Sequence, residues 1–148
     1  MGSAVLDTTI GRSAEEVWAA IRDFGELGWY PHVDSCVVVD GVRTVTGHGR
    51  DLQIDERLTH HDDRERSFAY VLTDLRGETQ LEQADGSVVD IAHLVDHLRA
   101  GMVVQEVDTY ASRVTYWLEI DEGHDAHLAS TARNYQRAID NLKVVLEG

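Results

Sequence analysis

The chain has 148 residues, of which 43% are hydrophobic and 27% charged, a balance typical of one folded globular domain rather than of a long disordered or fibrous segment. It carries 13 Lys and Arg against 27 Asp and Glu, so the net charge is −14, and a field of this sign disfavours nucleic acid and anionic membrane surfaces as partners. Because Cys36 is the single cysteine, an intrachain disulfide is excluded.

The N-terminal residues predict a cytoplasmic protein. Residues 1–5 lack the charged and apolar regions of a secretory signal. No stretch of the sequence approaches the roughly 20 consecutive apolar residues that a membrane-spanning helix needs. We therefore expect neither secretion nor anchoring by such a helix.

The first part of the chain predicts a strand, a helix and an aromatic elbow. Residues 4–10 alternate and are rich in Thr, Val and Ile, which favours a strand. Ser13 and Glu16 have the spacing of a capping box, which marks the start of a helix. Apolar residues at helical spacing extend this helix to Phe24, before Gly25 and Gly28. The elbow is residues 29–31.

Strand patterns dominate the middle of the chain. Turn residues separate four β-rich segments, which predicts an antiparallel meander over residues 33–39, 42–46, 51–59 and 66–73. A later pair of segments, 102–110 and 113–120, flanks only Ala111 and Ser112. We expect this pair to form a tight hairpin with its turn at those two residues.

Residues 75–100 lie between these groups of strands, and part of this segment has helical signals. Ser87 and Asp90 have capping spacing and predict a helix that continues to Leu98. On it, His93 and His97 stand at i and i+4, a spacing that can hold zinc. Because no cysteine pair or His-Glu-x-x-His pattern accompanies them, we predict no metal site. On such a helix both histidines lie opposite the apolar residues Ile91, Leu94, Val95 and Leu98, which favours a solvent-facing position. The alternative is a lid over the cavity, with one histidine turned inward toward the ligand.

The C-terminal residues 126–146 predict a long amphipathic helix, with one apolar stripe that includes Tyr135 and Ile139. That stripe needs an apolar surface, and a curved antiparallel sheet is the surface that the other segments can build. The sequence therefore indicates an α+β fold in which sheet and helix pack face to face.

The chain resembles the START-like (SRPBCC) superfamily, in particular its polyketide cyclase/dehydratase branch. The resemblance rests on short strings in the same order and spacing: Ser13-Ala14-Glu15-Glu16-Val17-Trp18 leading to Asp23-Phe24, Leu27 to Pro31, Val42-Arg43, Glu56-Arg57-Leu58 with Asp62-Asp63, Phe68-Ala69-Tyr70, Val114-Thr115-Tyr116, and Tyr135 to Leu146. It implies one domain over residues 1–148 with a helix-grip fold: a curved antiparallel sheet around the long C-terminal helix, with a cavity between them. Segment 75–100 is then a helical insertion.

Glu56 is the first catalytic candidate. In the segment 51–59 it shares a face with Leu52, Ile54 and Leu58, so it points to the apolar side. A carboxylate there is costly unless it is paired. By resemblance, Arg43 faces the same cavity and can pair with it. Two interpretations stay open: a catalytic pair, or a buried ion pair that only fixes the sheet.

Aromatic residues supply the other candidates. Tyr70 shares a face with Phe68, and both can enter the interior, as can Tyr116 of the last strand. A phenol there either donates a hydrogen bond to a developing oxyanion or only packs. By resemblance, Trp29 belongs to the loop at the cavity entrance. The predicted ligand-binding set is Trp29, Phe68, Tyr116, Tyr135, His93 and His97.

These observations lead to two functional hypotheses. The first is an enzyme similar to polyketide cyclases and dehydratases, which needs no cofactor and uses Glu56, Arg43 and Tyr70 for acid–base chemistry. The alternative is a carrier or sensor that binds the same kind of ligand without converting it. Either way the expected partner is a small apolar or aromatic, polyketide-like molecule. The oligomeric state stays open, with a homodimer as one option.

Overall fold

A computed structural model describes residues 2–47, 51–82 and 86–148, with the side chains of residues 81 and 82 left aside. Its elements, in chain order, are β1 (Gly2–Ile10), α1 (Ala14–Ile21), β2 (Val33–Val39), β3 (Val42–Gly47), β4 (Leu52–Asp62), β5 (Ser67–Gly77), β6 (Gln80–Glu82), β7 (Val88–Asp90), the 3₁₀ helix η1 (Ile91–Leu94), β8 (Leu98–Asp108), β9 (Ala111–Ile120) and α2 (Leu128–Glu147).

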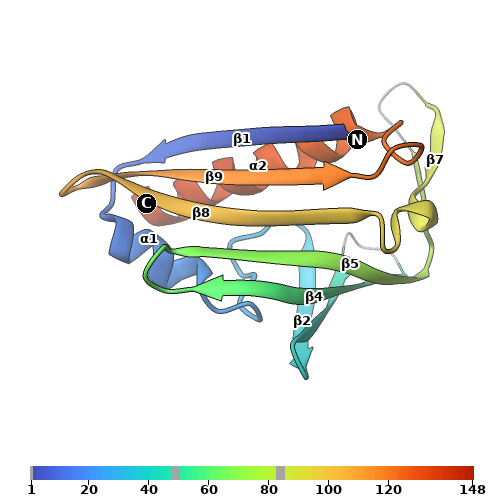
Figure 1. Ribbon diagram of the computed structural model, residues 1–148, viewed down its shortest axis with the longest axis horizontal. Coiled ribbons are helices and arrows are strands. Elements are labelled where there is room, and N and C mark those ends of the chain that lie inside the picture. Colours follow the sequence, from blue (N-terminus) through green and yellow to red (C-terminus); the bar gives the residue numbers. More distant parts are fainter. Residues whose placement is uncertain (1, 48–50, 83–85) are drawn as a thin grey trace.

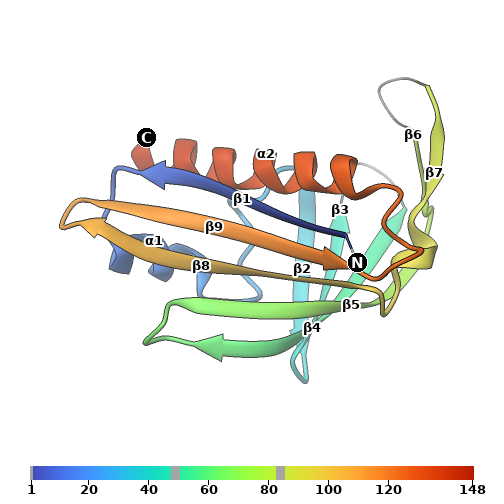
Figure 2. The same cartoon turned by 45° about the horizontal axis from the view of Figure 1, so that its top comes forward.

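The main sheet has seven antiparallel strands in the order β1-β9-β8-β5-β4-β3-β2. It curls strongly, so that β2 and β3 run across the direction of β8 and β9 (Figure 1). The helix α2 lies along the sheet (Figure 2) and buries Tyr135, Ala138, Ile139 and Leu142. This arrangement confirms the α+β helix-grip fold. None of the described helices is both long and apolar enough to cross a membrane.

The helix α1 starts where the sequence predicts and ends earlier. The Ser13 side chain accepts a hydrogen bond from the backbone of Glu16 at 3.2 Å, as in a capping box. The helix stops at Ile21 rather than at Phe24, because Asp23 accepts a hydrogen bond from the Gly25 backbone and forms a local turn. Phe24 still reaches the core and is only 8% exposed.

The pairing of β4 with β5 contains two irregularities that compensate each other. Residues 52–55 and 60–62 of β4 follow one register, whereas residues 56–58 are offset by one position. Thr73 is the extra residue on β5, and Thr59 is the extra residue on β4. Along a regular strand, Asp74 would face inward like Tyr70 and Leu72, because every second residue lies on the same face. The extra residue Thr73 shifts this alternation by one position. Leu75 therefore faces the interior in place of Asp74.

The segment 75–100 is not the helical insertion that the sequence predicts. It continues β5 to Gly77 and forms the hairpin β6–β7 before β8 begins at Leu98. Among its described residues, only the four of η1 are helical. The N-cap of η1 is Asp90, whose side chain accepts a hydrogen bond from the Ala92 backbone at 2.9 Å. Val88 and Val89 instead pair with β6 as a strand, which suits β-branched residues. The hairpin projects beyond the sheet near the start of α2 (Figure 2).

The last hairpin is shifted by two residues from its expected place. Its turn is formed by Thr109 and Tyr110, and Ala111 and Ser112 already belong to β9. Asp108 stabilises the turn by accepting a hydrogen bond from the Tyr110 backbone at 2.7 Å. Local side-chain bonding therefore decided the turn position.

Candidate functional site

A cavity of about 820 Å³ lies between α2 and the inner face of the curled sheet. Its walls come from β3, β4, β5 and β9, from α2, and from the loop that leads into β2. The loop and η1 contribute Leu27, Tyr30, Ile91 and Leu94 at its edge. This volume is in the range of sites that enclose a small molecule.

Arg43 and Glu56 form an ion pair on the cavity wall. They are direct neighbours across β3 and β4, and Arg43 Nε lies 2.7 Å from Glu56 Oε1. The side chain of Arg43 is 3% exposed and that of Glu56 is 12% exposed. Both line the cavity, so the structure brings together the two residues that we expected to meet there.

Arg43 is held from several sides. Its Nη1 donates to the carbonyl oxygen of Phe24 at 3.1 Å. The guanidinium carbon lies 4.0 Å from the ring centre of Phe24 and 4.8 Å from that of Tyr70, distances typical of cation–π contacts. Burial alone disfavours the charge, but attraction by Glu56 outweighs it and raises the pKa of Arg43 above its usual range. The guanidinium of Arg43 therefore stays charged.

Three tyrosine hydroxyls form a chain next to this pair. Tyr70 donates to the Tyr135 hydroxyl at 3.2 Å, and the Tyr70 and Tyr116 hydroxyls lie 2.5 Å apart. Either hydroxyl of the Tyr70–Tyr116 pair can be the donor. When Tyr70 donates to Tyr135, Tyr116 donates to Tyr70, because a phenol has one proton. The proton of Tyr135 is then available to a ligand oxygen.

Burial also sets the protonation of these tyrosines. Desolvation raises the pKa of Tyr70, Tyr116 and Tyr135 well above the usual range of a phenol. All three therefore remain protonated near neutral pH and act as hydrogen-bond donors. The rings of Tyr116 and Tyr135 stack with centres 4.2 Å apart, which fixes the hydroxyls in place.

Two of the predicted ligand contacts are core residues instead. Trp29 is 5% exposed and Phe68 is 3% exposed, and neither belongs to the cavity wall. The Trp29 carbonyl accepts a hydrogen bond from Asn141 of α2 at 2.5 Å, and the neighbouring Tyr30 lines the cavity instead. Phe68 packs between Phe24 and Tyr70, with ring centres 6.0 and 6.3 Å away.

His93 and His97 lie at the rim beside His124 and His127, and of these four only His127 lines the cavity. Burial, together with the positive charges that the neighbouring histidines can carry, lowers the pKa of His93. Because η1 is short, the two expected residues do not share a helical face. They contact residues of the β9–α2 connection instead.

Several polar residues of the cavity wall were not predicted from the sequence: His127, Ser130, Thr131, Arg133, Asn134 and Arg137. Tyr30 also lines the cavity, and it belongs to the elbow that the resemblance places at the cavity entrance. Most of the polar residues lie on α2 beside the apolar stripe that contains Tyr135. Their helical spacing relative to Tyr135 was available as a signal, whereas nothing in the elbow indicated that Tyr30 rather than Trp29 faces inward.

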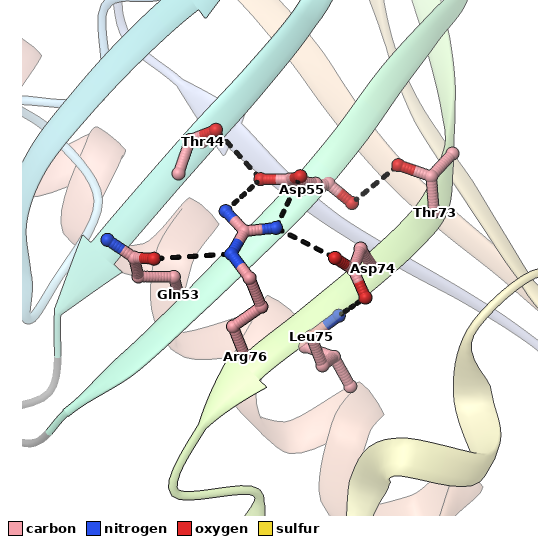
Figure 3. A network of polar contacts seen from close by, with 7 residues as sticks. All are labelled: Thr44, Gln53, Asp55, Thr73, Asp74, Leu75 and Arg76. Carbon is pink, nitrogen blue, oxygen red and sulfur yellow. Dashed lines mark hydrogen bonds and ion pairs between the residues drawn. The ribbon is translucent and has the colours of Figure 1, made fainter.

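The outer face of the same strands has a different ion-pair network. Arg76 donates to Asp55 Oδ2 at 2.7 Å and to Asp74 Oδ2 at 2.8 Å, and Gln53 and Thr44 join from the neighbouring strands (Figure 3). The Arg76 side chain is 42% exposed. Asp55 and Glu56 are adjacent, yet one pairs with a solvent-facing arginine and the other with a buried one.

The curled sheet, the long terminal helix and the cavity between them define the class as a helix-grip protein. The chain belongs to the polyketide cyclase/dehydrase and lipid transport family, whose sequence model matches residues 1–147. No curated protein matches the chain.

Several solved structures are similar to the chain in fold. They include the protein XoxI from Bacillus cereus (19% identity, TM-score 0.77, covering 100% of this chain and 99% of that one). The Zhui aromatase/cyclase from Streptomyces sp. R1128 is 14% identical, with a TM-score of 0.73 and coverage of 99% and 93%. A START superfamily protein from Mycobacterium smegmatis is 11% identical, with a TM-score of 0.66 and coverage of 97% and 98%. At these identities the likeness concerns the fold alone.

Proposed function

We propose that the protein is a cofactor-independent enzyme that transfers protons on a small, mostly apolar carbonyl compound in the cytoplasm, with an outcome of the cyclase or dehydratase type. One observation carries this proposal: the ion pair between Arg43 and Glu56 and the proton of Tyr135 border the same cavity. Family membership and the aromatase/cyclase named among the similar structures support it.

Glu56 acts as the base in this scheme. Its Oε1 is engaged by Arg43, so Oε2 takes a proton from a carbon next to the substrate carbonyl. The electron pair of that C–H bond moves toward the carbonyl oxygen and gives an enolate. Tyr135 donates a hydrogen bond to this oxygen, and the positive charge of Arg43 stabilises it. The enolate then attacks a second carbonyl of the same molecule, and the resulting alkoxide takes up the proton from Glu56. In the dehydratase outcome the enolate instead expels a β-hydroxide, which takes up the same proton and leaves as water. Glu56 is a carboxylate again in both cases.

In this scheme Tyr70 has a different role from the one expected from the sequence. Since Tyr70 donates its own proton to Tyr135, it does not donate to the substrate. It instead orients the Tyr135 hydroxyl, and Tyr116 orients Tyr70. Tyr70 is thus a positioning residue. The apolar walls fold a flexible substrate into its reactive conformation.

A carrier or sensor is the second candidate function, and one feature favours it. Arg43 is already satisfied by Glu56, by the Phe24 carbonyl and by two rings. This is how a purely structural buried pair would look. A protein of this kind would bind the same ligands in the cavity and release them unchanged.

The two functions are separated by exchange of α-protons in 2-tetralone, a small aromatic ketone, followed by NMR in D₂O. We expect the protein to accelerate exchange, and Glu56→Gln to lower the rate at least about a hundredfold while ligand-induced shifts persist. Glu119→Gln, at a side chain that is 43% exposed, is the matched control and should keep full activity.

Binding without accelerated exchange would favour the carrier. Exchange that survives in Glu56→Gln would remove Glu56 from the mechanism. Native mass spectrometry of freshly purified protein would then show which natural ligand occupies the cavity.

A further inference from the structure

Four histidines gather where η1 and β8 meet the connection from β9 to α2. His93 and His97 come from the first segment, and His124 and His127 come from the second. The ring of His124 stacks on that of His97 with centres 3.7 Å apart. The ring of His93 has its centre 5.5 Å from that of His124 and 5.9 Å from that of His127.

The spacing of His93 and His124 suits a shared metal ion. Their Nδ1 atoms face each other at 3.4 Å. Two nitrogen ligands, each about 2.0–2.1 Å from a tetrahedral zinc ion, lie roughly 3.3–3.4 Å from each other. We infer that His93 and His124 are ligands of a divalent transition-metal ion of the zinc type, a class that imidazole nitrogens bind well. Without the ion, one Nδ1 holds a proton that it shares with the other, and binding displaces this proton.

Neighbouring groups hold one of the two ligands in place. The Nδ1 of His97 lies 3.1 Å from Asp121 Oδ2, and Arg99 donates to the other oxygen of Asp121 at 2.8 Å. His97 is therefore fixed by a carboxylate and, through stacking, fixes the plane of His124. Such outer contacts orient metal ligands in proteins.

His127 does not supply a third ligand in its present position, because among the described residues only His60, Asp62 and Glu65 hold three ligand atoms within 4.8 Å of one another. The ring of His127 is next to that of His93, and a rotation of its side chain would turn a nitrogen toward the ion. Because His127 also lines the cavity, the ion would sit at the cavity rim, with water in its remaining position.

The ion would tie together two sides of the cavity edge. Ile91, Leu94 and Leu98 line the cavity from the segment that carries His93, and His127 lines it from the other segment. A bound ion would thus limit how far these segments separate when a ligand enters. This structural role is independent of the proton transfer at Glu56, and it departs from our expectation of no metal site.

A second cluster in the described part of the chain offers a comparison. His60, Asp62 and Glu65, at the end of β4 and in the turn that follows it, bring metal-ligating atoms within 4.8 Å of one another. However, the Oδ1 atom of Asp62 already accepts hydrogen bonds from the backbone of Arg64 and Glu65. This turn serves best as the control.

The test is a titration of the untagged, full-length protein, stripped of metal, with Co²⁺, followed by visible absorption and then by displacement with Zn²⁺. We expect one equivalent of Co²⁺ to give the bands of a low-coordinate nitrogen site, and Zn²⁺ to raise the melting temperature. His93→Gln and His124→Gln should each weaken binding by roughly tenfold or more. His60→Gln should bind as the unmodified protein does.

Folding of each variant is checked by circular dichroism in the presence of a chelator. Absence of saturable Co²⁺ binding would overturn the proposal. Binding lost in His60→Gln but kept in both His93→Gln and His124→Gln would also overturn it, because the ion would then occupy the surface turn.

Discussion

Replacing Arg43 by methionine should destabilise the fold strongly. Methionine is similar to arginine in length but is apolar. The substitution therefore removes the partner that lies 2.7 Å from the Glu56 carboxylate and the donor that lies 3.1 Å from the Phe24 carbonyl oxygen. Removal of one partner from a buried ion pair costs about 3–5 kcal/mol. Since Glu56 borders a cavity and is 12% exposed, water recovers part of this, and we expect a loss of about 3 kcal/mol.

Urea unfolding followed by tryptophan fluorescence measures this loss. With a slope of about 2 kcal/mol per M, the midpoint should fall by about 1.5 M. The control is Arg76→Met on the outer face, where the arginine side chain is 42% exposed, and it should cost at most about 1 kcal/mol. A second variant, Arg43→Met with Glu56→Leu, should recover much of the loss because no unpaired charge remains.

A loss below about 1 kcal/mol in Arg43→Met would refute this reasoning. It would mean that Glu56 turns into the cavity and is fully hydrated there. The pair would then contribute little to stability.

Two further substitutions test other parts of the structure. Hydrogen bonds from Arg22 lower the pKa of Asp63 in the folded protein. The stabilisation that this pair gives is therefore present above about pH 4, the usual pKa of an unfolded-state Asp, and is lost as the pH falls through the lower pKa of the folded state. Asp63→Asn should flatten the acid side of a plot of urea midpoint against pH, and an unchanged slope would contradict this. A Cβ on Gly101 would lie 2.5 Å from the Phe68 carbonyl oxygen and 2.7 Å from the Trp117 ring. Gly101→Ala should therefore lower the free energy of unfolding by about 1–3 kcal/mol. An unchanged melting temperature would contradict this, because it would mean that β8 moves away at no cost in free energy.

Strand alternation predicted the inward position of Glu56 correctly, because residues 52–58 alternate without interruption and one face is buried. The long terminal helix followed equally from its stripe. Arg43 could be placed only by resemblance, since its strand is short. These features depend on patterns within a few residues, which a sequence shows directly.

The errors arose where distant residues decide the structure. The spacing of Ser87 and Asp90 indicated a helix, but pairing of β7 with β6 overrides it, as in the match of Asp90 with Gln80. The contact between His93 and His124 joins segments that are separated by an entire hairpin of the main sheet. No local pattern could have shown that these two rings meet.

The two cancelling bulges of β4 and β5 have a consequence for how such a cavity can change. They bound a short patch that includes Glu56 and Tyr70, and outside the patch the strands return to their original register. Removal of Thr73 or Thr59 would close one bulge and leave the partners on either side of it in place, so the inward-facing residues of the patch would stay the same. The change would fall on the local bend and twist of the two strands, and so on the shape of the cavity wall rather than on its chemistry.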